Sequence, residues 1–159
     1  MEIINSKLIG TGACIPDFVL TNAMLEKMVD TNDEWIVQRT GVRERRIAKN
    51  THTWELALGA AQDALADAGI TNTPNTASIL QDKLGARQVG AFDINNACTG
   101  FVSATDIADS YIKSGKAKTV LVVSAETLSR IVDYTDRSTC ILFGDGAAAA
   151  VYQATEDET

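Results

Sequence analysis

The chain alternates between stretches with the spacing of strands and stretches with the spacing of helices. Four apolar runs are typical of buried strands: residues 3–13, 89–94, 119–124 and 142–152. Apolar residues at three- and four-residue spacing predict helices from Thr21, from Thr31, over 56–68, over 75–84 and from Cys98 to Ser114. Strands that alternate with helices indicate an α/β protein with a mixed, mostly parallel sheet and helices on both faces. The many alanines of the helix at residues 56–68 predict close packing on that sheet.

A cysteine lies at the break between the strand at residues 89–94 and the helix that follows it. Asn95 and Asn96 are turn and cap residues, and the helical pattern begins at Cys98. Unpaired N–H groups and the dipole at a helix N-terminus favour a thiolate over a thiol. Gly100 leaves room for a ligand to approach the backbone. These residues alone leave two interpretations of Cys98 open: a nucleophile, or an inert small residue in the core, as most free cysteines are.

The composition of the chain excludes several classes of protein. The 159 residues are 45% hydrophobic and 22% charged, which suits one soluble globular domain with a sizeable core. A net charge of −7 argues against a nucleic-acid or anionic-membrane binder. Because no apolar run approaches the length of a membrane span, we expect neither a signal peptide nor a membrane-spanning segment. Three cysteines without a secretory signal predict reduced thiols in the cytoplasm, and one histidine gives a zinc site little support.

One basic cluster interrupts this acidic chain at residues 39–46, with the sequence Arg-Thr-Gly-Val-Arg-Glu-Arg-Arg. Such a run is either a solvated loop or a surface that binds an anionic ligand. Charge alone leaves both interpretations open.

Several long motifs resemble, in order, the N-terminal half of the β-ketoacyl-acyl carrier protein synthase III family, condensing enzymes of the thiolase fold. They cover almost the whole chain: Gly10-Thr11-Gly12 with Pro16, D-E-W-I-V-Q-R-T-G-V-R-E-R-R-I-A over 33–48, A-L-A-D-A-G-I ending at Ile70, D-I-N-N-A-C-T-G-F over 93–101, S-A-E-T-L-S-R over 124–130, and D-Y-T-D-R-S-T-C-I-L-F-G-D-G-A over 133–147. The resemblance implies a thiolase-like fold. Residues 1–159 would form the N-terminal half-domain of a duplicated α-β-α layered architecture whose C-terminal half is absent here.

The resemblance implies a role for seven residues, which lie at matching motif positions. They are the nucleophile Cys98, the adenine-stacking pair Trp35 and Arg137, Thr31 beside that ring, Arg39 at a nucleotide phosphate, and Leu128 and Phe143 along the acyl channel. The chemistry agrees, because guanidinium groups suit phosphate, and arginine and tryptophan stack on a planar base. The resemblance implies no metal and no separate cofactor, since the coenzyme A (CoA) thioester is itself the substrate.

The implied activity is that of an acyltransferase that starts fatty-acid synthesis. An acyl-CoA, with acetyl-CoA as the expected primer, acylates Cys98; malonyl-acyl carrier protein then loses carbon dioxide, and its carbanion attacks the thioester. The N–H of Cys98 is expected to donate to the developing oxyanion. The expected partners are acyl-CoA, malonyl-acyl carrier protein and a second copy of the protein. Two alternatives stay open: a related acyltransferase of specialised metabolism, and a non-catalytic fragment or split half.

Two departures from the family pattern change what we expect of this chain alone. The family's catalytic His and Asn belong to the C-terminal half, and His52, the one histidine here, falls in a polar loop and does not match. This half alone is therefore not expected to complete the reaction. Relatives also carry a strand after the motif that ends at Ile70, expected between the first strand and the one at 90–94. Because its loss would leave backbone groups unpaired, we predict a break in the chain between about residues 70 and 77.

Overall fold

The structure is a computed structural model that describes residues 5–69, 78–86 and 89–156. Within these ranges the elements are β1 (Asn5–Cys14), β2 (Phe18–Thr21), α1 (Asn22–Leu25), α2 (Asp33–Thr40), β3 (Glu44–Ile47), α3 (Thr53–Asp67), α4 (Ser78–Lys83), the 3₁₀ turn η1 (Ala97–Thr99), α5 (Gly100–Lys113), β4 (Thr119–Thr127), the 3₁₀ turn η2 (Leu128–Arg130) and β5 (Asp145–Thr155). The described residues form two compact units. The sheet unit takes those within 1–14, 57–124 and 147–159, and the β2–β3 unit takes those within 15–56 and 125–146.

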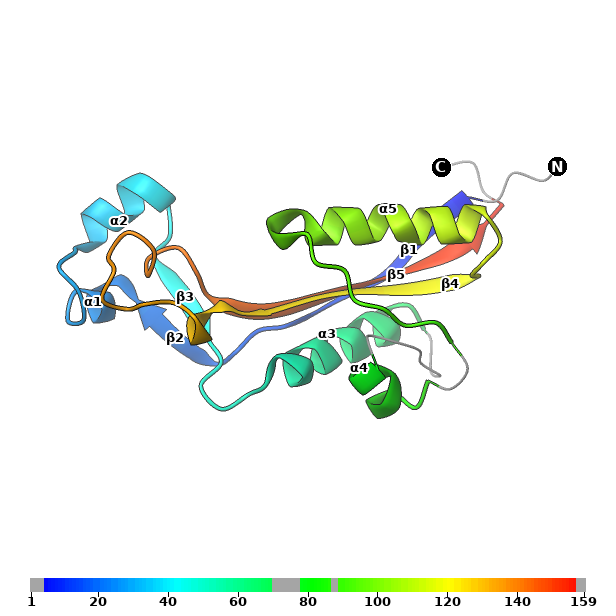
Figure 1. The fold of residues 1–159 in the computed structure, drawn as a ribbon, viewed down its shortest axis with the longest axis horizontal. Coiled ribbons are helices and arrows are strands. Elements are labelled where there is room, and N and C mark those ends of the chain that lie inside the picture. Colours follow the sequence, from blue (N-terminus) through cyan, green and yellow to red (C-terminus); the bar gives the residue numbers. More distant parts are fainter. Residues whose placement is uncertain (1–4, 70–77, 87–88, 157–159) are drawn as a thin grey trace. The chain divides into compact units, whose positions relative to one another are not determined.

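The sheet unit holds a three-stranded sheet in which β5 lies between β1 and β4, with α5 on one face and α3 on the other (Figure 1). β1 and β5 pair antiparallel, and a bulge interrupts the pairing between Leu8 and Gly10. An extra residue at a bulge reverses the alternation of faces. Accordingly, Ser6 donates a hydrogen bond to Asp109 of α5 before the bulge, whereas Gly10 and Gly12 face α3 after it.

The predicted close packing of the alanine-rich helix is confirmed. A Cβ atom built on Gly12 would lie only 2.3 Å from the backbone nitrogen of Ala64 and 2.4 Å from the carbonyl oxygen of Ala60. A Cβ built on Gly10 would lie 2.3 Å from the Ala64 carbonyl oxygen. The backbone of β1 therefore lies against the backbone of α3, and no larger side chain fits between them.

β1 is an edge strand among the strands that the structure describes, and α3 covers its open edge. The backbone N–H groups of Thr11 and Ala13 donate to the carboxylates of Asp67 and Asp63, at 2.9 and 3.2 Å. These contacts satisfy groups that an edge strand otherwise leaves open. The prediction that a lost strand lies beside the first strand, between it and residues 90–94, is therefore wrong.

Two further details of the predicted sheet are wrong, although the α/β class with helices on both faces is confirmed. Residues 89–94 lie in irregular structure, with Phe92 and Ile94 exposed, and the described part of the chain places no strand beside them to form a ladder. The registers of β1 with β5 and of β2 with β3 are antiparallel, not parallel. A continuous apolar run indicates burial on both faces, and that pattern does not fix the direction of the neighbouring strand.

The β2–β3 unit is built on a short antiparallel pair and a small apolar core. β2 and β3 were not predicted, because each has only four residues and β3 reads as charged sequence. Leu25 of α1 and Ile36 of α2 are fully buried in the core together with Cys140. α2 ends at Gly41, whose φ of +72° is a left-handed helix cap that favours glycine.

Two further expectations concern a break in the chain and a membrane-spanning segment. The predicted break between about residues 70 and 77 falls outside the described residues and stays a prediction. Among the helices that the structure describes, none is both long enough and apolar enough to cross a membrane.

The contact between β1 and α3 predicts that Gly12→Ala destabilises the protein. The new Cβ would meet backbone atoms at 2.3–2.4 Å, and backbone cannot swing away as a flexible side chain can. We expect a loss of about 1–3 kcal/mol or more in the free energy of unfolding, measured by denaturant titration. Gly146→Ala is the matched control, because a Cβ there meets nothing within 4 Å. Equal stability of the two variants would contradict this packing.

Candidate functional site

Trp35 lies at the centre of a cluster of aromatic and cationic side chains in the β2–β3 unit. Its backbone N–H donates to Oδ1 of Asn32 at 2.8 Å, which caps α2 and fixes Trp35 in the first turn. The guanidinium carbons of Arg39 and Arg137 each lie 4.2 Å from the centroid of the Trp35 ring. Arg39 follows one turn later on α2, whereas Arg137 comes from the loop between η2 and β5. Each such contact is worth about 0.5–2 kcal/mol.

The loop that carries Arg137 is held in shape by its own side chains. The Asp136 carboxylate accepts hydrogen bonds from the N–H and hydroxyl of Ser138, at 2.9 and 2.6 Å, and from the hydroxyl of Thr139 at 2.8 Å. The bonds from Ser138 hold the pKa of Asp136 below its usual value. Arg137 also lies 3.8 Å from the exposed carboxylate of Asp30. Contacts between exposed charges are weak, so a ligand can displace this one.

Thr31 immediately precedes the cap of α2 and has a buried hydroxyl group. Among the buried side-chain oxygens and nitrogens of the described residues, Oγ1 of Thr31 is left without a hydrogen-bond partner. A buried hydroxyl in this state costs about 1–3 kcal/mol. A bound ligand that offered a partner would remove that cost.

Leu128 and Phe143, the two residues predicted for an acyl channel, flank a buried carboxylate. Asp145 accepts hydrogen bonds from the N–H and hydroxyl of Ser129, at 2.9 and 2.6 Å, and from the N–H of Ala48 at 2.7 Å. These bonds fix η2, which begins at Leu128, against the start of β5. Leu128 is half-buried and Phe143 is exposed. The channel itself stays a prediction. The positioning role of Asp145 was missed, although the Gly-Asp-Gly turn marks its place in the sequence.

The basic cluster at residues 39–46 is not simply a solvated loop. Arg45 on β3 is buried, and its Nε and one terminal nitrogen both donate to the carbonyl oxygen of Ile141, at 2.9 and 2.7 Å. Burial lowers the pKa of Arg45 from its usual value. Sequence reasoning missed this residue. The available signal was the period of two in Glu-Arg-Arg-Ile, which puts Arg45 on the same face of the strand as Ile47.

Cys98 lies in the sheet unit, in the tight turn that leads into α5. The helix begins at Gly100 and not at Cys98, because η1 forms a 3₁₀ turn first. Ala97, just before the cysteine, has a φ of +43°, a left-handed conformation that costs free energy for a residue with a Cβ. The Thr99 N–H and hydroxyl both donate to the carbonyl oxygen of Asn96, at 3.2 and 2.9 Å. The turn therefore presents Cys98 on the surface and not in the core, and its role as the nucleophile stays a prediction.

The other two cysteines have different surroundings. Cys140 is fully buried in the core of the β2–β3 unit, and burial raises the pKa of its thiol. Cys14 is partly buried at the end of β1, where its sulfur would lie 2.9 Å from a Cβ built on Gly59. Exposure therefore distinguishes Cys98 from both.

Of the residues predicted for the site, the structure brings Trp35, Arg39 and Arg137 into direct contact. Thr31 adjoins them in sequence, at the start of the same helix. Cys98 belongs to the sheet unit, whereas Trp35, Arg39 and Arg137 belong to the β2–β3 unit, and each unit is described by itself. The phosphate contact predicted for Arg39 stays a prediction, since its guanidinium lies over the Trp35 ring.

Comparisons with known proteins identify the relatives of this chain. Residues 92–159 match the family model of 3-oxoacyl-[acyl-carrier-protein (ACP)] synthase III. The β-ketoacyl-[acyl-carrier-protein] synthase III of Aquifex aeolicus is 51% identical over 172 residues, which cover 98% of this chain and 56% of that protein. The aligned stretch is longer than the chain, so the relative carries internal residues that this chain lacks.

Solved structures agree with the sequence matches. The crystal structure of 3-oxoacyl-[acyl-carrier-protein] synthase III from Aquifex aeolicus superposes with a TM-score of 0.91 at 52% identity, covering 96% of this chain and 55% of that one. The priming β-ketosynthase from the R1128 polyketide biosynthetic pathway superposes with a TM-score of 0.92 at 32% identity, covering 96% and 51%. The resemblance is thereby confirmed: the chain is a thiolase-fold protein related to the β-ketoacyl-[acyl-carrier-protein] synthase III family. It spans about half the length of the relatives it matches.

The differences in burial predict the order in which the three thiols react with iodoacetamide. Cys98 should be alkylated first, by roughly tenfold or more over Cys140, because Cys140 is excluded from solvent and its raised pKa leaves less thiolate at a given pH. Peptide mapping after timed labelling of the full-length protein measures the order. Unfolding in denaturant is the control and should make Cys140 reactive. Alkylation of Cys14 or Cys140 before Cys98 in the folded protein would contradict the prediction that Cys98 is the most reactive thiol.

Proposed function

We propose that the protein takes an acyl group from a CoA thioester onto Cys98 and condenses it with malonyl-acyl carrier protein, which starts fatty-acid synthesis. The observation that carries this proposal is the Trp35 ring with two guanidinium groups against it. The relationship to β-ketoacyl-[acyl-carrier-protein] synthase III supports the same activity. Because the chain spans about half of such relatives, the activity is proposed for the whole protein.

The β2–β3 unit is proposed to bind the nucleotide end of the acyl-CoA. A purine base is flat and apolar on its faces, so it can stack on the Trp35 ring and under the Arg137 guanidinium. The hydroxyl of Thr31 lacks a partner and is suited to a ring nitrogen or amino group of that base. The planar guanidinium of Arg39 matches the geometry of phosphate oxygens and is proposed to contact a phosphate of the nucleotide. Leu128 and Phe143 are proposed to line the path of the acyl chain.

The sheet unit is proposed to supply the nucleophile. The Cys98 thiolate attacks the thioester carbonyl, the carbonyl carbon forms a new C–S bond, and CoA leaves as a thiolate that takes up a proton. The N–H of Cys98 is proposed to donate to the oxyanion of the tetrahedral intermediate. In the second step malonyl-acyl carrier protein loses carbon dioxide, its carbanion attacks the acyl-Cys98 carbonyl, and the Cys98 thiolate is released. The His and Asn that the family uses in this step have no matching residue among the 159.

The proposal also covers the cofactor, the location in the cell and the stable partner. The thioester already activates the acyl group, so no separate cofactor is proposed. Three free thiols suit a reducing cytoplasm, and a second copy of the protein is the proposed stable partner.

The likeness to a priming β-ketosynthase of a polyketide pathway favours one alternative, an acyltransferase that primes a specialised product. A non-catalytic half of a larger assembly is the other.

The stacking cluster predicts how single substitutions change the affinity for CoA. Trp35→Ala and Arg137→Ala should each raise the dissociation constant by roughly 2- to 30-fold, because each removes a contact worth about 0.5–2 kcal/mol. Arg39→Ala should also make binding less sensitive to salt, since a phosphate partner is lost. Isothermal titration calorimetry with CoA on the full-length protein measures both effects.

Arg46→Ala is the matched control for these three substitutions. Arg46 carries the same charge in the same basic cluster, but its ion pair is with Glu44 at 3.8 Å. Its removal should leave the affinity for CoA almost unchanged. If all three test variants bound CoA as tightly as this control, the proposed nucleotide site would be wrong.

A further inference from the structure

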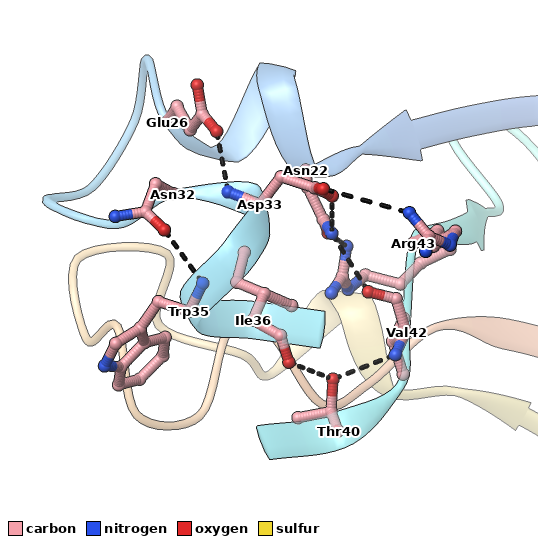
Figure 2. A network of polar contacts seen from close by, with 10 residues as sticks. Asn22, Glu26, Asn32, Asp33, Trp35, Ile36, Thr40, Val42 and Arg43 are labelled. Atoms are coloured by element: carbon pink, nitrogen blue, oxygen red, sulfur yellow. Dashed lines mark hydrogen bonds and ion pairs between the residues drawn. The ribbon is translucent and has the colours of Figure 1, made fainter. Parts of the chain in front are cut away.

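The carboxamide of Asn22 is buried at the centre of a polar network in the β2–β3 unit (Figure 2). Its nitrogen Nδ2 donates one hydrogen bond to Oδ1 of Asp33 at 2.7 Å and another to the carbonyl oxygen of Val42 at 2.9 Å. Its oxygen Oδ1 accepts a hydrogen bond from a terminal nitrogen of Arg45 at 2.8 Å. Both amide protons and the oxygen of this side chain are therefore in use.

The two donated bonds hold both ends of α2, the helix that carries Trp35. Asp33 is the first residue of α2, and Val42 follows two residues after its last residue, Thr40. The chain turns back at Gly41, and the hydroxyl of Thr40 secures the turn by donating to the Ile36 carbonyl at 2.8 Å and accepting from the Val42 N–H at 3.0 Å. One NH₂ group thus contacts the first residue of α2 and the residue just beyond its C-terminal cap.

The accepted bond connects Asn22 to the loop that carries Arg137. Arg45 donates twice to the carbonyl oxygen of Ile141, as described above. The neighbouring Cys140 N–H donates to the Asp136 carbonyl at 3.1 Å, which ties this point back to the residue beside Arg137. A short path of hydrogen bonds therefore runs from the Trp35 helix through Asn22 and Arg45 to the Arg137 loop.

We propose that Asn22 and Arg45 are positioning residues that set the spacing between the Trp35 ring and the Arg137 loop, and thereby the affinity for the nucleotide part of the acyl donor. The proposal rests on the proposed function, in which a base stacks between these two groups. In the structure the Arg137 guanidinium lies 4.2 Å from the Trp35 ring centroid, closer than a base between them would allow. A base that enters must separate the Arg137 guanidinium from the Trp35 ring. Asn22 and Arg45 meanwhile hold the backbone of α2 and the backbone of the Arg137 loop in fixed positions relative to each other.

An asparagine suits this position because its amide has a donor end and an acceptor end. The NH₂ end faces the Asp33 carboxylate and the carbonyl end faces the Arg45 guanidinium, so the amide dipole is aligned between a negative and a positive group. An aspartate would keep the contact with Arg45 and even strengthen it as a charge pair. It would lose both donated bonds and place a second negative charge against Asp33. Asn22→Asp therefore perturbs α2 selectively and leaves the bond to Arg45 in place.

The experiment compares two acyl donors that share the reacting thioester but differ in the nucleotide: acetyl-CoA and S-acetylpantetheine. The readout is the ratio of the second-order rate constants for acetylation of Cys98 in the full-length protein. Asn22→Asp should lower the rate with acetyl-CoA by about tenfold or more and leave the rate with S-acetylpantetheine unchanged. Adding Asp33→Asn should restore part of the ratio, since an amide at position 33 can donate to the new carboxylate.

A second pair of variants tests the proposal from the exposed side of the network and leaves the buried residues Asn22 and Arg45 unchanged. Asp33→Ala and Glu34→Ala each remove one negative charge from the exposed first turn of α2. Only Asp33 contacts Asn22, whereas Glu34 accepts a weak bond from Gln38 at 3.2 Å. Asp33→Ala should lower the ratio about three- to tenfold, and Glu34→Ala should not. Because both sites are exposed, this pair is informative even if Asn22→Asp fails to fold.

The outcomes separate the positioning role from the proposed function. If the unchanged protein shows no preference for acetyl-CoA, or keeps it in Trp35→Ala, the nucleotide site itself is wrong. If Trp35→Ala removes the preference but Asp33→Ala behaves like Glu34→Ala, the positioning role of Asn22 is overturned and the nucleotide site stands. Equal loss with both donors in Asn22→Asp, in a protein with an unchanged melting temperature, would also overturn it.

Discussion

The β2–β3 unit depends on one buried contact, the hydrogen bond between the Asn22 carboxamide and the Arg45 guanidinium. Three polar groups around it are paired through these two side chains: the Asp33 carboxylate, the Val42 carbonyl and the Ile141 carbonyl. Breaking a buried network of this kind leaves donors or acceptors without partners, which costs more than each bond contributes. A two-stranded pair such as β2 and β3 is marginally stable on its own in water, so the unit also needs the contacts that α1, α2 and the loop before β5 add.

This constraint connects local structure to the candidate site. In the proposed nucleotide site, stacking of a base requires that α2 hold Trp35 in a fixed position and that the loop before β5 hold Arg137 in a fixed position relative to it. The sheet unit has its own unusual local geometry. The left-handed φ of Ala97 and the 3₁₀ turn at 97–99 place Cys98 on the surface, although free cysteines are usually buried. In each unit, local contacts thus fix the position of a residue with a predicted role: Trp35 and Arg137 in the β2–β3 unit, and Cys98 in the sheet unit.

The sequence predicts the long helices better than it predicts how the strands pair. The periodic helices at 53–67 and 100–113 were foreseen, because periodicity is a local signal. The resemblance paired Trp35 with Arg137, which the structure brings into contact, and their role in binding stays a prediction. The neighbour of β1 was not foreseen, since β5 lies more than a hundred residues away and its pairing depends on the whole sheet. No role in a site was predicted for Asn22, and Arg45 belonged to a basic run whose role charge alone left open. Only tertiary contacts reveal that both are buried.

The most direct test of the account is acetyl transfer from acetyl-CoA to the full-length protein, followed by mass spectrometry of its peptides and assay of released CoA. The account predicts one acetyl group on the peptide that contains Cys98, with one molecule of free CoA released for each group transferred. Cys98→Ser should abolish both signals. Condensation with malonyl-acyl carrier protein that proceeds without acetylated Cys98, or an acetyl group found on Cys14 or Cys140 instead, would contradict it.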